Sequence, residues 1–216
     1  MKAILYYISL ALLFLLNKLP FCVLYLLSDM FYFIVYYLVR YRRRVVRDNL
    51  VKSFPEKGVR EIVEIEKKFY SSLCDWFVET IKYYGMSEKE IRRRMVITGL
   101  EDAHRMVAQG RSCVCYMGHL FNWEYVTSLA LYFDDEDLVI GDIYHPLENS
   151  YFDRLMKKMR DQYGAESITM ANTLRRIVQI TKEKKKYLIG FLADQVPTWE
   201  SVHHRVDFLH RDTPVS

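Results

Sequence analysis

Short apolar runs alternate with segments of helical periodicity between residues 100 and 193. Three runs have the length and composition of buried strands, namely Ser112–Met117, Leu138–Tyr144 and Tyr187–Ala193. The helical segments lie near 100–109, 122–133, 149–163 and 172–182. Strands that alternate with helices form parallel pairs, and the helices cover the faces of the sheet. The sequence therefore predicts an α/β fold with a mixed, largely parallel sheet flanked by helices.

Two helices are predicted before this alternating region. Residues 60–84 carry apolar side chains at helical spacing, and Gly85 is placed to end that helix. Ser87 and Glu90 have the spacing of a capping box, which predicts a short second helix.

The N-terminus is unusually apolar. The run at residues 21–39 is long enough to cross a bilayer and contains one acidic residue, Asp29. The run at residues 3–16 is shorter, and it fits an interfacial or a signal-like segment. No small-residue cleavage motif follows it, so we expect it to be retained as part of an N-terminal, membrane-associated helical segment.

A basic cluster follows the second apolar run directly. Its members are Arg40, Arg42, Arg43, Arg44 and Arg47. Such a cluster beside an apolar segment is typical of the cytoplasmic side of a membrane, where it binds anionic headgroups. Nucleic acid is the alternative ligand, but a net charge of only +4 argues against a dedicated nucleic-acid binder. We therefore predict a membrane anchor with a basic juxtamembrane segment at residues 1–47 and a second domain at residues 48–216.

Several common kinds of site are not indicated. The four cysteines (Cys22, Cys74, Cys113 and Cys115) do not have zinc-ligand spacing, and the sequence has no HExxH motif. His203 and His204 are adjacent, which disposes them poorly to bind one ion together. A GxSxG nucleophile motif is also missing. We therefore predict no metal site and no bound cofactor.

Polar residues follow each of the three predicted strands. The pairs are Gly118-His119, Tyr144-His145 and Asp194-Gln195. In open α/β sheets, ligands bind beyond the carboxyl ends of parallel strands, which meet at one edge. The sequence therefore predicts a functional site at this edge.

His119 and Glu124 are the central candidates within that site. An imidazole accepts a proton from a hydroxyl more readily when a carboxylate orients it and stabilises the imidazolium. On one continuous helix the two side chains would diverge by roughly 140°. They meet if His119 lies in the turn before the helix and Glu124 in its first turn. The alternative is a structural histidine in the turn and a glutamate favoured by the helix N-terminus, and spacing alone leaves both interpretations open.

The segment H-L-F-N-W-E at residues 119–124 also matches the H-x4-D/E motif of the glycerolipid and lysophospholipid acyltransferase superfamily. Further motifs resemble its bacterial branch, the lipid A biosynthesis (late) acyltransferases. They are the apolar N-terminus with its arginine cluster, R-x-N-L-x-x-S-F-P-E at 47–56, Y-x-P-x-x-N at 144–149, Asp153 and Arg160 with Gly164 after them, and G-F-L-x-D-Q at 190–195. Their order and spacing cover nearly the whole chain.

The resemblance implies transfer of a fatty acyl group from acyl carrier protein, or from another acyl thioester such as acyl-CoA, to a hydroxyl of a membrane lipid. A lipid A precursor is the expected acceptor, at the cytoplasmic face of the inner membrane. His119 would be the general base and Glu124 its orienting carboxylate, so no enzyme nucleophile is required. Asn122 is a candidate donor to the oxyanion. Acylation of a lysophospholipid or an aminolipid is the alternative reaction, and a non-enzymatic, membrane-tethered lipid-binding module is the alternative without chemistry.

The same resemblance suggests substrate-binding residues. Arg160 would hold an acceptor phosphate, and Asp153, seven positions earlier, shares its helix face. Asp194 and Gln195 would support the acceptor site or Arg160. The remaining candidates are Tyr144 and Asn149, while Lys184–Lys186 fits either a solvated face or a surface for the acidic carrier protein.

Three features depart from the family pattern. His145 stands where the family usually has arginine, which weakens the case for a phosphate clamp there. The family continues for several tens of residues past an Asp-Thr-Pro-like element, whereas this sequence stops at Ser216, so we expect the second domain to be incomplete at its C-terminus. Finally, these motifs do not separate enzymes acting on lipid A from those acting on other lipids.

Overall fold

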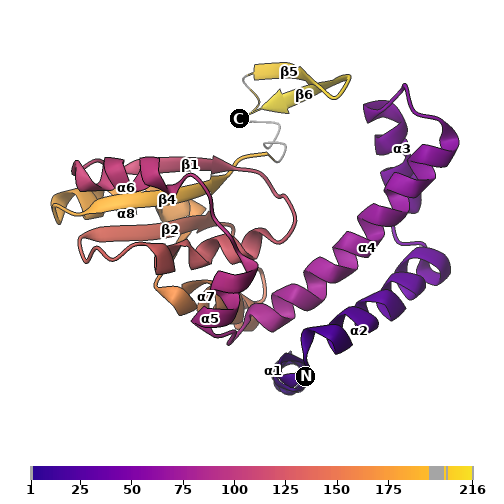
Figure 1. Cartoon of the computed structure of the whole chain (residues 1–216), viewed down its shortest axis with the longest axis horizontal. Helices are drawn as coiled ribbons and strands as arrows, with labels where there is room; N and C mark the ends of the chain where they lie inside the picture. The colour runs from indigo at the N-terminus through magenta and orange to yellow at the C-terminus, as the bar shows by residue number, and fades with distance from the viewer. Residues whose placement is uncertain (1, 195–201, 203, 216) are drawn as a thin grey trace. The chain divides into compact units, whose positions relative to one another are not determined.

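A computed structural model describes residues 2–194, 202 and 204–215 (Figure 1). The helices are α1 (Lys2–Lys18), α2 (Phe21–Phe33), the π-helix η1 (Ile34–Val39), α3 (Arg43–Ser53), α4 (Val59–Tyr83), α5 (Glu88–Arg94), α6 (Leu100–Ala108), the 3-10 helix η2 (Trp123–Tyr132), α7 (Ser150–Arg160), the 3-10 helices η3 (Asp161–Tyr163) and η4 (Met170–Asn172), and α8 (Thr173–Lys182). The strands are β1 (Cys113–Met117), β2 (Leu138–Tyr144), β3 (Glu166–Thr169), β4 (Lys186–Leu192), β5 (His204–Phe208) and β6 (Arg211–Val215).

The chain divides into two compact units. The sheet unit consists of residues 1–17 and 82–193, and the helical unit consists of residues 18–81 and 194–216. This division follows contacts, whereas the segments 1–47 and 48–216 were inferred from hydropathy and motifs. The functional division between those two segments therefore stays a prediction.

The sheet unit contains a four-stranded sheet in the order β1-β4-β2-β3. Figure 1 shows β1, β4 and β2 in this order. Every neighbouring pair in it is parallel; for example, Cys113 pairs with Leu188 and Asp142 with Gly190. The predicted α/β class is confirmed, with helices flanking a sheet that is wholly parallel. Because all four strands run in one direction, their carboxyl ends lie at the same edge.

The two faces of the sheet are covered by different helices. Cys113 on β1 contacts Met106 of α6, with 3.9 Å between the sulfur atoms. The register places Cys113 and Asp142 on the same face, which also receives η2 and α7. On the other face, Arg176 of α8 donates to Glu166 at 2.7 and 2.8 Å. Buried aliphatic side chains fill the space between the layers, namely Val107, Ile140, Met159, Ile168, Ile180, Leu188 and Ile189.

Most predicted elements in this unit occur within one or two residues of their expected bounds. The Ser87 side chain accepts from the Glu90 N–H at 3.3 Å, so the predicted cap of α5 is present. Gly85 follows α4 with φ 75°, a left-handed conformation that suits glycine. The segment expected as a helix at 122–133 is a 3-10 helix, and β3 was not predicted because Glu-Ser-Ile-Thr is short and has one apolar residue.

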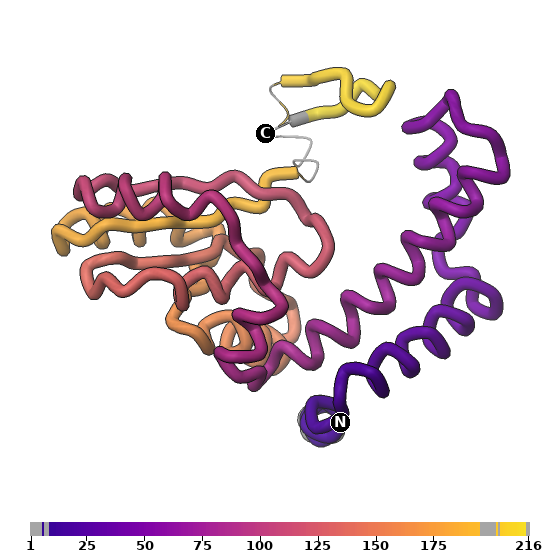
Figure 2. Tube along the Cα trace, viewed as in Figure 1, coloured from indigo at the N-terminus to yellow at the C-terminus, as the bar shows by residue number. Residues whose placement is uncertain are grey.

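The helical unit is built on an antiparallel pair, α2 and α4. Tyr25 near the start of α2 donates to Glu79 near the end of α4 at 2.8 Å. Tyr36 in η1 donates to Glu66, earlier in α4, at 2.9 Å. The helices therefore run side by side in opposite directions (Figure 2). In the same unit, the hairpin β5–β6 contacts α3 through Arg211, which donates to Asn49 at 2.7 Å.

Candidate active site

The turn after β1 carries His119. The strand ends at Met117 and η2 begins at Trp123, so His119 lies in the connecting turn. Its half-buried ring stands nearly perpendicular to the Trp123 ring, with 4.9 Å between the centroids. The predicted arrangement, with the histidine before the helix and Glu124 in its first turn, is therefore present.

The same turn contains a strained residue. Phe121 has φ 47°, in the left-handed region that side chains other than glycine and asparagine rarely adopt. Phe121 is 87% exposed, and the neighbouring Leu120 is 75% exposed. Two apolar side chains thus project into solvent directly after His119, and one of them does so at a cost in backbone energy.

Glu124 is buried, with 3% of its side chain exposed, and it forms an ion pair with Arg160 at the end of α7. Arg160 Nε donates to Oε2 at 2.8 Å and Nη2 donates to Oε1 at 2.7 Å. Burial is the largest single influence on the pKa of Arg160 and would lower it, but the hydrogen bonds to Glu124 together with the negative charges of Glu124 and Asp142 raise the pKa above its usual value. These two hydrogen bonds from the Arg160 guanidinium fix the orientation of the Glu124 carboxylate.

Asp142 on β2 adds a second carboxyl group to this region. Its Oδ1 atom is buried and has no hydrogen-bond partner among the described residues. Burial raises the pKa of Asp142 to about 6, the positive charge of Arg160 opposes that rise, and the negative charge of Glu124 adds to it. The motifs indicate no role for Asp142, although a lone acid within the apolar strand Leu-Val-Ile-Gly-Asp-Ile-Tyr is a visible signal.

Three of the predicted residues lie at the end of β2, in the first turn of α7 or in the connection between them. Tyr144 lies at the end of β2, and its ring centroid is 5.6 Å from Cζ of Arg160. Asn149 caps α7 by accepting from the Tyr151 N–H at 3.0 Å. Asp153 accepts from the Leu147 N–H at 2.9 Å, so it holds the loop against its own helix. Asn149 and Asp153 therefore shape the loop, and Tyr144 lies beside the guanidinium.

The remaining candidates have different positions. Asn122 is half-buried and immediately precedes η2. Asp194 follows β4 by two residues and belongs to the helical unit, and Gln195 lies outside the described residues. Lys186 pairs with Asp135 at 2.6 Å, whereas Lys184 is exposed. Lys186 therefore takes part in an ion pair within the chain, and the choice between a solvated face and a carrier-protein surface for Lys184–Lys186 stays a prediction.

The sheet edge therefore combines a half-buried imidazole, a carboxylate fixed by a guanidinium, and a second buried carboxyl. No group of three or more His, Cys, Asp or Glu side chains suited to a metal ion occurs among the described residues. The imidazole of His119 and the carboxyl groups of Glu124 and Asp142 can transfer protons and stabilise charge.

The family model for bacterial lipid A biosynthesis acyltransferases matches residues 1–215. The chain belongs to this family. It is therefore an acyltransferase, and its family acts in lipid A biosynthesis, as the resemblance of its motifs had implied. A search of curated proteins finds no match to the chain.

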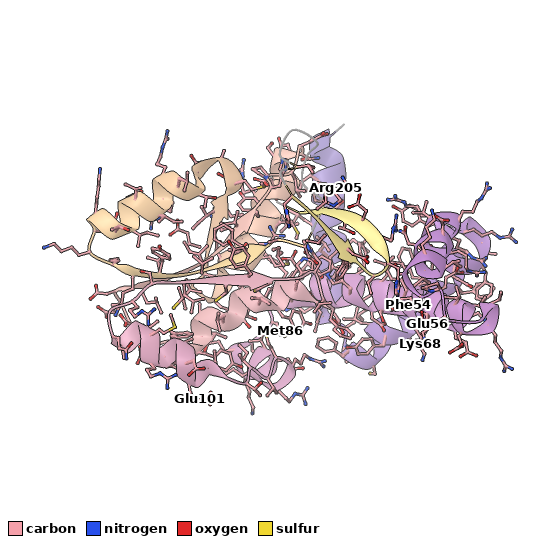
Figure 3. All side chains as sticks on the ribbon, turned by 90° about the horizontal axis from the view of Figure 1, so that it is seen from above. Phe54, Glu56, Lys68, Met86, Glu101 and Arg205 are labelled. Carbon is pink, nitrogen blue, oxygen red and sulfur yellow. The ribbon has the colours of Figure 1, made fainter. Side chains whose placement is uncertain are left out.

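The motif residues that the chain shares with this family are divided between the two units. The motif residues His119, Glu124, Tyr144 and Arg160 of the acyltransferase all lie in the sheet unit. The Arg47–Glu56 motif lies in the helical unit, where α3 ends at Ser53, and Phe54 and Glu56 follow it (Figure 3). The match identifies the class of reaction that the chain catalyses.

Proposed function

We propose that the acyltransferase moves a fatty acyl group from acyl carrier protein to a hydroxyl of a lipid A precursor, at the cytoplasmic face of the inner membrane. The observation that carries this proposal is the buried Glu124–Arg160 pair, in the first turn of the helix that follows the His119 turn. The apolar segment 21–39, which has the length and composition of a membrane span, supports a membrane location only weakly.

His119 would act as the general base. Its imidazole takes the proton of the acceptor hydroxyl while the oxygen attacks the thioester carbonyl carbon. The tetrahedral intermediate then collapses, the carbon–sulfur bond breaks, and the thiolate leaves with the proton returned by the imidazolium. The lipid gains an ester, the carrier regains a free thiol, and no acyl-enzyme forms. This route agrees with the lack of a GxSxG motif.

Glu124 would orient His119 and stabilise the imidazolium. A carboxylate performs this role only if it is held at a fixed angle. Arg160 provides such a hold through two hydrogen bonds, and each carboxylate oxygen retains a lone pair for a further bond. Arg160 would therefore act mainly as a positioning residue. If Arg160 also binds an acceptor phosphate, as predicted, it would do so through the N–H groups that do not donate to Glu124.

The oxyanion of the intermediate requires a donor. Asn122 lies between His119 and Glu124 along the chain, and its side-chain amide N–H groups would donate to the oxyanion. Asp194 and Gln195 would support the acceptor, and Tyr144, Asn149 and Asp153 would define the loop beside it. No resident cofactor is required, because the acyl thioester is a substrate. Acyl-CoA remains the alternative donor.

Replacement of His119 by alanine tests the proposal. Transfer from acyl carrier protein to a lipid A precursor should fall about 1,000-fold, which is the usual scale of general-base catalysis. The exposed His104, on α6, provides the matched control, and His104→Ala should retain activity. Unchanged transfer by His119→Ala would contradict the base assignment.

A second measurement identifies the acceptor and the donor. Mass spectrometry of lipid A, phospholipids and aminolipids should show the loss of one acyl group from lipid A alone when the enzyme is removed from its host. A change confined to lysophospholipid or aminolipid acylation would reject the lipid A precursor. Faster transfer from acyl-CoA than from acyl carrier protein would reject the proposed donor.

A further inference from the structure

The segment formed by α2 and η1 has the length of a membrane span, but one side of it is polar. Ser28 is 1% exposed and donates to Asp75 of α4 at 2.7 Å. Tyr25 and Tyr36 donate to the carboxylates of Glu79 and Glu66. Three hydrogen bonds spread over this length join α2–η1 to α4, so the two helices form one rigid pair.

The end of this pair is fixed by a buried charge network. Glu66 is fully buried, and it accepts from Tyr36 at 2.9 Å and from Arg43 at 3.3 Å, and also from Arg47. Two arginines of the basic cluster are therefore structural, since they compensate a buried carboxylate. Arg40, Arg42 and Arg44 are exposed.

The opposite side of α2–η1 is apolar and exposed. Its large exposed side chains are Leu26, Met30, Phe31, Phe33, Ile34, Tyr37, Leu38 and Val39. Phe77 of α4 is also exposed, and its ring centroid lies 6.0 Å from that of Phe31. We name this set of exposed apolar side chains of the helical unit the apolar face; the charged Asp29, on the same helix, is also exposed. An exposed apolar surface of this size marks a contact with lipid or protein.

The partner helix cannot follow α2–η1 into hydrocarbon. The hydrogen bonds hold α4 alongside α2–η1, and α4 exposes charged side chains at Glu61, Glu64, Lys67 and Lys68. A perpendicular α2–η1 would draw Lys67 and Lys68, and also Asp29, into the bilayer core. Charged residues at that depth are strongly unfavourable.

We propose that α2–η1 lies in the plane of an anionic bilayer surface and does not cross the membrane. The apolar face enters the acyl-chain boundary, the charged side of α4 faces water, and Arg40, Arg42 and Arg44 contact lipid phosphates. A helix pair with one apolar and one charged side is the arrangement of interfacial anchors. The basic residues at one end of the apolar face favour anionic lipid over a protein partner. This inference rests on the membrane association within the proposed function.

Spin labels measure the depth of each position directly. The full chain with the exposed Cys22 changed to serine would carry one introduced cysteine at a time, at Leu26, Met30, Ile34 or Leu38. The probe membrane is a vesicle with equal parts of phosphatidylglycerol and phosphatidylcholine. A label at Lys68, an exposed position of α4 that is marked in Figure 3, is the control.

The two arrangements predict different depth profiles. An in-plane segment places all four labels at one shallow depth and leaves Lys68→Cys in water. A crossing segment places Met30→Cys and Ile34→Cys deepest and the other two near opposite surfaces, and that profile would overturn the inference. Labels that all remain in water would overturn it as well.

Acyl transfer measured on the same labelled proteins separates the inference from the proposed function. A crossing profile in an active protein would reject only the in-plane arrangement. A shallow profile in a protein that transfers no acyl group to lipid, even without the labels, would reject only the proposed function. Circular dichroism of each variant confirms that its helices are formed before the depth is interpreted.

Discussion

Arg160, the last residue of α7, donates two hydrogen bonds, of 2.8 and 2.7 Å, to the carboxylate of Glu124 in the first turn of η2. The two residues are 36 positions apart in the chain. Because the carboxylate is buried, removal of the guanidinium would leave a charge without compensation. The geometry of the proposed base therefore depends on a residue from a different helix.

Replacement of Arg160 by lysine should lower kcat about 10- to 100-fold with little change in KM. Lysine keeps the positive charge but lacks the planar fork, so the orientation of Glu124 would be lost. Steady-state kinetics with varied lipid acceptor measure both constants. Arg154→Lys, at an exposed position of the same helix, should behave as wild type. A large rise in KM at constant kcat would instead support binding of an acceptor phosphate by Arg160.

Replacement of Asp142 by asparagine should stabilise the chain at neutral pH. The pKa of Asp142 is raised from 3.8 to about 6 on folding, so the folded chain binds more protons than the unfolded chain between these values. The free energy of unfolding of the wild type should therefore fall as the pH rises through this window. The asparagine variant avoids that loss, and its advantage should grow to about 2–3 kcal/mol above pH 6. Denaturant unfolding between pH 4 and pH 8 measures it, and a pH-independent difference would contradict the argument.

Replacement of Phe121 by glycine should not destabilise the chain, although it removes a large apolar side chain. The left-handed φ of 47° costs an ordinary residue about 1–2 kcal/mol, and Phe121 is 87% exposed, so few contacts are lost. The greater backbone entropy of unfolded glycine offsets part of that gain. Leu120→Gly lacks the relief of strain and should be less stable by about 0.5–1 kcal/mol. Equal losses in both variants, measured by denaturant unfolding, would show that the Phe121 backbone is not strained.

Replacement of Glu66 by glutamine should destabilise the helical unit by about 2 kcal/mol. Glutamine leaves Arg43 and Arg47 without a counter-charge, and the partial exposure of these arginines keeps the loss below that of a fully buried pair. Glu64→Gln is the matched control, because Glu64 is exposed and pairs with Arg60 on the surface at 3.6 Å. Its cost should stay below about 0.5 kcal/mol. Thermal unfolding followed by the helical signal measures both, and equal effects would contradict the structural role of Glu66.

Much of the fold follows from local features of the sequence. Apolar runs alternating with helical periodicity predicted β1, β2 and β4 and their parallel arrangement, since those patterns depend on which residues face a core. Glycine and serine at helix ends predicted where α4 stops and α5 starts. The family of the chain was also visible in the spacing of its motifs, which the family model confirms over residues 1–215.

Other features depend on contacts between distant residues and appear only in the folded chain. Periodicity does not reveal that Arg160 binds Glu124. It also does not reveal that folding buries Asp142 within reach of the charges of that pair. The basic cluster looked uniform in sequence, yet folding commits Arg43 and Arg47 to Glu66 and leaves three arginines exposed. Local composition determined which segments are helix, strand or apolar surface. Tertiary packing decided which charges are paired, because desolvation penalises any buried charge that lacks a partner.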